Sequence, residues 1–155
     1  MNQTRTSSDS AQSPVVSRGV RGAVTVDVDN REEVLRATRQ MLALLIRRNG
    51  IEKSDVASAT FTVTSDLKSE FPAVAARQLG WIEVPLLCGY EIQVEGSLER
   101  CVRVLIHWNT TKTQTDIHHV YLHGAKRLRP DLMSFPEVDF DELETWITSQ
   151  MQEEM

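Results

Sequence analysis

The chain has 155 residues, of which 41% are hydrophobic and 25% are charged, and its formal net charge is −5. This length suffices for one domain with a substantial core, and the negative charge gives no support for nucleic acid or an anionic membrane surface as the main partner. No apolar run approaches the roughly 20 residues that cross a bilayer, so the sequence predicts a soluble protein with no membrane partner.

The N-terminal segment 1–17 is rich in Ser, Thr and Gln and lacks the apolar stretch of a secretory signal, so we expect a disordered tail whose targeting role stays open. Cys88 and Cys101 both lie in apolar, strand-like runs. One disulfide between them is one interpretation, but reduced core thiols in a cytoplasmic protein are favoured.

The first half of the chain carries the clearest secondary-structure signals. Residues 20–28 alternate and are β-branched, which predicts a strand. Asn30 is a good helix N-cap with Glu33 three residues later, and Gly50 supplies the stop. Between them the apolar residues recur at helical spacing, so a helix is expected over this segment.

The middle of the chain is predicted to alternate between strand and helix. Residues 57–63 resemble a second strand, and Pro72 is well placed in the first turn of a short helix that ends at Gly80. A third strand region over 84–94 is expected to be interrupted at Gly89.

Further strands are expected over 101–106 and 119–122, followed by an extended piece that reaches Pro130. Residues 139–151 have apolar side chains at helical spacing and predict a last helix. This order of elements indicates an α+β or α/β sheet domain with tails at both ends.

Arg103 is the most informative residue because it lies in a run, CVRVLI, that otherwise indicates a buried strand. Alternation places Arg103 on one face of the strand and Val102 and Val104 on the other. A buried guanidinium is costly unless acceptors surround it. From position alone, an edge-strand arginine that reaches solvent is the favoured interpretation.

Four further arginines lie in or beside predicted elements, at Arg18, Arg21, Arg77 and Arg129. Each has an ordinary surface interpretation on its own. If several of them converge on one pocket, that pocket would bind a small molecule with more than one carboxylate.

The remaining polar candidates are ambiguous. Cys88 and Glu91 point to opposite faces of an unbroken strand, and a bulge near Gly89 would bring them into one site. His119 and His123 share strand parity, but no cysteine or acidic partner stands at a metal-motif spacing, so no metal is expected. Nucleotide, nucleophile and zinc-protease motifs are likewise missing from the sequence.

Six short motifs occur in an order that resembles the monofunctional chorismate mutases of the AroH class. The resemblance runs from about Arg18 to Leu132. The motifs are RGVRGA at 18–23, FPAVAAR at 71–77, CGYE at 88–91, CVRV at 101–104, HVYL at 119–122 and LRPDL at 128–132.

The resemblance implies an α+β domain over 18–132, with a mixed sheet and helices on one face, in a homotrimeric pseudo-α/β barrel. Active sites would lie between subunits and convert chorismate to prephenate in phenylalanine and tyrosine biosynthesis, without a cofactor. Residues 133–155 would form an extension, expected to be helical. These features are expectations from the family alone.

The resemblance also implies roles for individual residues. Arg103 would lie beside the ether oxygen of the breaking bond, and Glu91 would accept a hydrogen bond from the ring hydroxyl. Arg21 would bind a substrate carboxylate. The other implied pocket and entrance residues are Cys88, Tyr121, Phe71, Ala73, Leu128, Arg77 and Arg129.

The sequence departs from the family pattern at Val74, where a lysine is expected, and at Leu87, where a threonine is expected. Two alternative functions therefore stay open at this point. One is an enamine/imine deaminase of the Rid type, which shares a related fold. The other is a non-catalytic protein that binds a dicarboxylate.

Overall fold

A single mixed β-sheet forms the centre of the computed structural model, which describes residues 13–132 and 137–153. The strand order is β3-β2-β4-β1-β5. The β1–β4 and β2–β4 pairs are antiparallel, whereas the β1–β5 and β2–β3 pairs are parallel. The strands are β1 (Val16–Thr25), β2 (Val56–Val63), β3 (Leu86–Tyr90), β4 (Cys101–Thr110) and β5 (Val120–Leu122).

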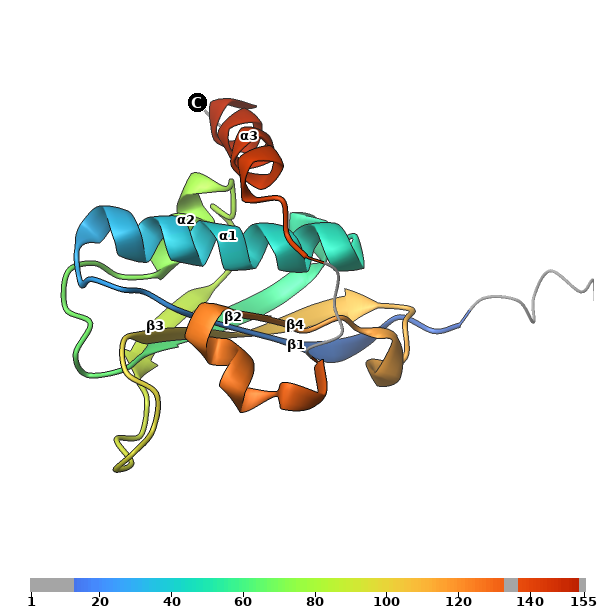
Figure 1. The fold of residues 1–155 in the computed structure, drawn as a ribbon. Coiled ribbons are helices and arrows are strands. Elements are labelled where there is room, and N and C mark those ends of the chain that lie inside the picture. The colour runs from blue at the N-terminus through green and yellow to red at the C-terminus, as the bar shows by residue number, and fades with distance from the viewer. Residues whose placement is uncertain (1–12, 133–136, 154–155) are drawn as a thin grey trace, which may run out of the picture.

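Helices cover one face of this sheet (Figure 1). They are α1 (Arg31–Asn49) and α2 (Ala73–Gln78), and α3 (Phe140–Glu153) lies beyond α1 on the same side. A 3₁₀ helix, η4 (His123–Leu128), lies on the opposite side (Figure 1). The predicted α+β class, with a mixed sheet and helices on one face, is confirmed. The remaining short 3₁₀ helices are η2 (Lys53–Asp55), η3 (Gln114–Asp116) and η5 (Pro130–Leu132).

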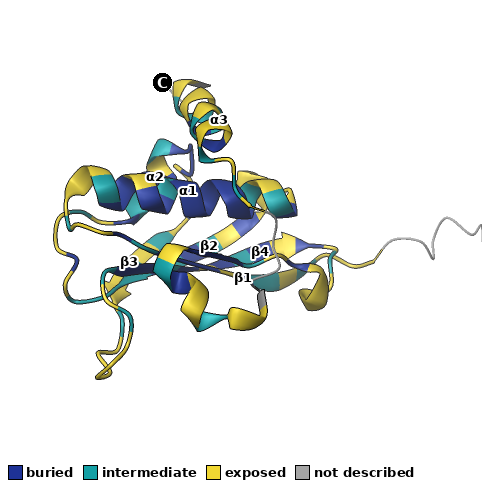
Figure 2. Ribbon diagram, viewed as in Figure 1, coloured by how far each residue is buried: buried dark blue, intermediate teal, exposed yellow. Residues whose placement is uncertain are grey.

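Helix α1 begins and ends where its local signals predict. Asn30 is the N-cap, and its Oδ1 accepts a hydrogen bond of 2.8 Å from the Glu33 backbone N–H. Gly50 ends the helix at φ 72°, a left-handed conformation that glycine adopts without a steric penalty. The face of α1 toward the sheet is fully buried, as the dark side of the helix in Figure 2 shows.

Strand ends differ from the predictions because the partner strands determine them. β1 begins at Val16 instead of Val20, since residues 16–19 pair with the second half of β4. The predicted tail over 1–17 therefore overlaps β1 at Val16 and Ser17, and residues 1–12 lie outside the described part of the chain.

Two further predictions about the sheet are wrong. β3 runs through Gly89, which pairs with Thr62, and the chain leaves the sheet after Tyr90 because β2 ends at Val63. The extended piece expected after 122 is instead η4. That segment turns away from the sheet at His123, whose φ of 54° ends the strand.

Gly22 allows α1 to approach β1 closely. A Cβ placed there would lie 2.8 Å from Leu45 Cδ1 and 3.0 Å from Met41 Cγ, and both of these side chains are fully buried. Gly22 therefore serves close packing between β1 and α1. Replacement of Gly22 would overpack this contact.

We expect Gly22→Ala to lower the free energy of unfolding by about 1–3 kcal/mol, because the added methyl group must displace side chains that have no free volume. Urea unfolding at a fixed protein concentration measures this change. Gly19→Ala is the matched control on the same strand, since its new Cβ would lie 3.6 Å from Leu105 Cδ1, an ordinary contact. Equal stability of the two variants would contradict the close-approach interpretation.

Helix α3 packs on the outer side of α1 (Figure 1). Leu143 and Ile147 are each 1% exposed and belong to the main core. The last helix, predicted over 139–151, is observed over Phe140–Glu153. Residues 133–136 and 154–155 of the predicted extension lie outside the described residues.

Candidate active site

Arg103 lies on β4, the middle strand of the sheet, on the face away from α1. The edge-strand interpretation is therefore wrong, because strands flank β4 on both sides. Its neighbours Val102 and Val104 point to the helices and are buried, which confirms the predicted alternation. A central, permanently charged side chain of this kind needs a specific reason.

One row of residues crosses the sheet at the level of Arg103. Residues in register on adjacent strands point to the same face, so Arg103 shares its face with its direct partners in the other strands. We call this set the sheet row. In spatial order it consists of Tyr121, Ala23, Arg103, Thr62 and Gly89.

Glu91 is fixed beside Arg103 just after β3 ends. Its backbone N–H donates to the Val63 carbonyl oxygen at 2.9 Å. Its Oε2 accepts a hydrogen bond of 2.6 Å from Thr62 Oγ1 and lies 3.7 Å from Arg103 Nε. Both charged side chains are less than one-third exposed, so Glu91 offsets part of the cost of placing Arg103 there.

Two polar atoms of the sheet row are buried without a hydrogen-bond partner among the described residues, Arg103 Nε and the Tyr121 hydroxyl. Buried donors are nearly always paired, and each unpaired one costs about 1–3 kcal/mol. Their positions in one row on one face indicate donors that are kept free for the oxygen atoms of a ligand.

Two arginines, Arg21 and Arg129, lie near the β5 edge of the sheet. Arg21 pairs with Leu105 and so points to the same face as Arg103. The pKa of His119 is lowered, first by burial and then by the charges of Arg129 and Arg21, so both arginines approach this one side chain. A neutral His119 also accepts a hydrogen bond of 2.9 Å at Nδ1 from the Arg21 backbone N–H.

Arg129 follows η4 and forms a bidentate ion pair with Asp131, at 3.0 and 2.8 Å. These hydrogen bonds are the main reason why the pKa of Arg129 is raised, with a smaller effect from the nearby Tyr121 hydroxyl. Tyr121 makes no hydrogen bond of normal geometry to it. Leu128 packs on the small buried cluster of Ala23, Cys101, Tyr121 and Ala125.

Cys88 lies on the opposite face of the sheet. It pairs with Phe61, which is fully buried under the helices, and β3 pairs with β2 without a register shift. The predicted bulge that would bring Cys88 beside Glu91 is therefore wrong. Burial raises the pKa of the Cys88 thiol, an effect that the Ala73 backbone N–H opposes, so the group is a neutral thiol at pH 7.

Phe71 and Cys88 together line a hollow of about 520 Å³ at the β3 edge, which we call the Phe71 hollow. Phe71 is 68% exposed although it is aromatic. Two of the lining side chains were not predicted: Lys68 stands in no motif, and Tyr90 lies in the CGYE motif but was given no role. Thr62 was also missed, and the alternation of 57–63 was the available signal for it.

Arg77, Val74 and Leu87 lie outside the sheet row. Arg77 donates from Nη1 to the backbone carbonyl oxygen of Ile82, and its guanidinium is held at the end of α2. Val74 packs against the core and Leu87 is exposed on the sheet.

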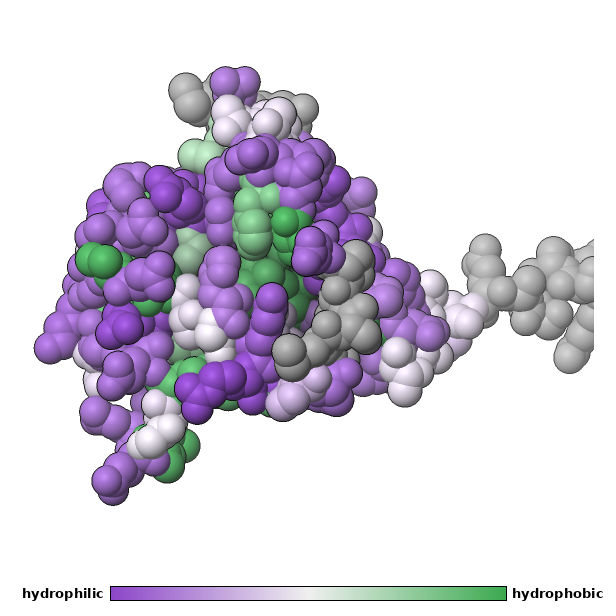
Figure 3. Space-filling model, in the orientation of Figure 1, coloured by the Kyte–Doolittle hydropathy of each residue, from purple (hydrophilic) through white to green (hydrophobic). Residues whose placement is uncertain are grey.

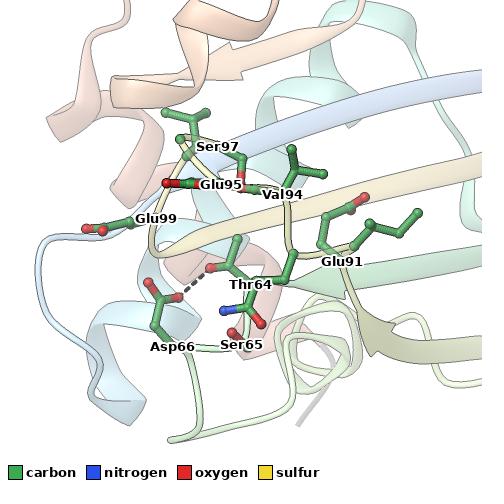
Figure 4. Close-up of a pocket in the computed structure, with 12 residues that line it drawn as sticks. Thr64, Ser65, Asp66, Glu91, Val94, Glu95, Ser97 and Glu99 are labelled. Carbon is green, nitrogen blue, oxygen red and sulfur yellow. Dashed lines mark hydrogen bonds between the residues drawn. The ribbon is translucent and has the colours of Figure 1, made fainter.

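A second hollow, of about 340 Å³, lies beneath the loop 91–99 and carries negative charge. Asp66 accepts hydrogen bonds from Thr64 Oγ1 at 2.5 Å and from the Arg100 backbone N–H at 2.9 Å. Glu91 lies at the side of this hollow away from Asp66 (Figure 4). Its acidic lining, with Glu95 and Glu99, would repel a carboxylate ligand.

No cluster of three His, Cys, Asp or Glu side chains within 13–132 and 137–153 could hold a metal ion. Across the same residues, no helix is both long and apolar enough to span a membrane.

Comparison with known proteins identifies this arrangement. The family model described as chorismate mutase type I matches residues 17–132. The chain belongs to the chorismate mutase type I family.

Two curated relatives, both named chorismate mutase AroH, are similar over most of their length. The one from Thermus thermophilus is 52% identical over 118 residues, which are 76% of this chain and 97% of the relative. The one from Bacillus subtilis strain 168 is 44% identical over 116 residues, 74% of this chain and 91% of the relative.

A solved structure, the chorismate mutase from Clostridium thermocellum, has a TM-score of 0.69 and 48% sequence identity. The match covers 70% of this chain and 97% of that chain. Membership of the chorismate mutase family favours chorismate mutase activity over the deaminase and the non-catalytic binder. The protein is therefore an isomerase.

Proposed function

We propose that the chain is a cytoplasmic chorismate mutase and a homotrimer, in which each active site combines the sheet row of one subunit with the Phe71 hollow of its neighbour. The observation that carries this proposal is a pair of buried donors with no hydrogen-bond partner among the described residues, Arg103 Nε and the Tyr121 hydroxyl, on the face where the Glu91 carboxylate lies 3.7 Å from Arg103 Nε. They provide two donors and one acceptor for a polyoxygenated ligand.

The sheet itself separates the two groups of predicted residues within one chain. Arg103, Glu91 and Tyr121 belong to the open face, whereas Cys88 lies on the helix face with Phe71. One small ligand in contact with both groups requires a second copy of the chain, whose hollow would close the sheet row.

Exposed apolar side chains on the open face support this assembly. Leu87 and Leu105 lie on that face, and Ile92 and Val94 extend from it in the loop 91–99. Ile92 is 80% exposed, and Figure 3 shows apolar atoms near the tip of that loop. Large apolar side chains exposed together are typical of an interface between proteins.

The rearrangement of chorismate is intramolecular, so it needs no proton transfer and no nucleophile. The enzyme has to hold a flexible dianion in its folded conformer and stabilise the charge that develops as the C–O bond breaks. An acceleration of about 10⁶-fold corresponds to about 8 kcal/mol of transition-state stabilisation.

The residues divide this work. Arg103 would donate to the ether oxygen, where negative charge develops, and Glu91 would accept from the ring hydroxyl. Arg21, with its charge at the β5 end, would bind a carboxylate. Leu128 and Arg129 would form the entrance, and Phe71 and Ala73 of the neighbour would form the opposite wall.

A cytoplasmic location is supported by the two thiols. Cys88 and Cys101 are free, and they point into regions on opposite sides of the sheet. Unpaired cysteines are typical of a reducing compartment.

Purified protein incubated with chorismate tests the proposed function. We expect loss of the ultraviolet absorbance of chorismate and formation of a product that acid converts to phenylpyruvate. Binding of chorismate without turnover at micromolar enzyme would favour the non-catalytic alternative. Turnover of an imine substrate would favour the deaminase.

A further inference from the structure

Helix α3 lies outside the part of the chain that the family shares. The family model ends at residue 132, whereas α3 begins at Phe140. The solved relative is covered to 97% of its length by a match that includes only 70% of this chain. The last helix is therefore an addition to the common fold, and its contacts indicate its role.

The body of α3 is anchored on α1 by apolar and polar contacts. Ile147 is buried in the main core. Gln40 Nε2 donates to Glu144 Oε1 at 2.8 Å, and Arg47 Nη1 donates to Glu142 Oε2 at 2.8 Å. These contacts fix α3 on α1, the longest helix among the described residues.

The first residue of α3 contacts the turn that follows β5. The Phe140 ring stacks on the His123 ring, with centroids 5.5 Å apart and an interplanar angle of 19°. His123 has a φ of 54°, which is unfavourable for a residue with a side chain and requires support from its surroundings. The residue after His123 is also held in place, because the Gly124 N–H donates to Thr25 Oγ1 at 2.9 Å.

The turn at His123 determines where η4 lies. It connects β5, which carries Tyr121, to η4, which carries Leu128. Ala125 of η4 is fully buried against Cys101 and Tyr121. A small movement at His123 would therefore displace η4 relative to the unpaired donors of the sheet row.

We propose that α3 is a strap that holds η4 over the active site, with Phe140 as the positioning residue. Phe140 acts through His123 and touches no substrate. The strap rests on the proposed function only where catalysis is the readout, because its effect on the motion of η4 is measurable without substrate.

Hydrogen exchange and steady-state kinetics of Phe140→Ala test this proposal. We expect amide exchange across 120–129 to increase by about threefold or more, because local opening needs less energy once the turn loses its support. The KM for chorismate should rise about three- to tenfold while kcat changes little, since the entrance contributes to binding more than to the chemical step. Phe140→Tyr keeps an aromatic ring and should restore both values.

Met151→Ala is the matched control, because Met151 is a partly buried apolar residue of the same helix that packs on the core at the opposite end. It should leave exchange across 120–129 unchanged. His123→Ala should reproduce the effect of Phe140→Ala, and the double variant should be no worse than either single one. Unchanged exchange in Phe140→Ala, or additive effects in the double variant, would overturn the strap. Absence of chorismate turnover by the wild-type protein would instead overturn the proposed function.

Discussion

Arg103→Lys should lower kcat by roughly 10²- to 10³-fold while the protein stays folded, because one preorganised donor at a developing oxyanion contributes about that much. The guanidinium is held in place before substrate binds, by the central position of β4 and by Glu91 at 3.7 Å. A lysine ammonium is a flexible point charge and does not reproduce the planar group of donors. The loss should therefore appear in kcat more than in KM.

Steady-state kinetics with chorismate measure this loss, and circular dichroism checks that the fold is kept. Arg36→Lys is the matched control, since Arg36 is an exposed arginine of α1 that pairs with Glu33 at 3.0 Å, away from the sheet row. The control should keep the wild-type kcat. A kcat near the wild-type value in Arg103→Lys would remove Arg103 from the chemical step.

Local signals in the sequence predicted the parts of the fold that local interactions determine. Helix α1 is the clearest case, because the Asn30 cap and the Gly50 stop act within one turn of the helix ends. The alternation of Cys101–Thr110 is equally local, and it placed Arg103 opposite Val102 and Val104 before any partner strand was known.

Predictions failed where a distant segment decides the outcome. β1 is longer at its start because β4 supplies partners for residues 16–19. Gly89 stays within β3 because Thr62 pairs with it. Whether β4 lies at the edge or in the centre depends on the order of all five strands. The alternation of apolar residues along one strand does not reveal that order.

The candidate site shows the same division. The resemblance named Glu91 and Arg103, and the structure brings them together through Thr62, a residue that no motif indicated. Cys88 was expected in the same pocket, but an unbroken β3 places it on the other face. A single sequence does not reveal that two faces of one sheet belong to two halves of a site, since the second half would come from another copy.

The site between subunits predicts a recovery of activity when two inactive variants are mixed. Arg103→Ala removes the donor of the sheet row, and Phe71→Asp adds a negative charge to the hollow that would face the same substrate. Each homotrimer should be nearly inactive. In mixed trimers, some sites receive an intact row from one subunit and an intact hollow from its neighbour.

Activity after unfolding and joint refolding of the two variants in equal amounts is the most direct test. Random assembly of a ring with three equivalent interfaces should make about a quarter of the sites intact, so about a quarter of the wild-type activity should return. Native mass spectrometry confirms that mixed trimers form. If mixed trimers are present and activity stays at the level of the separate variants, the active site does not lie between subunits.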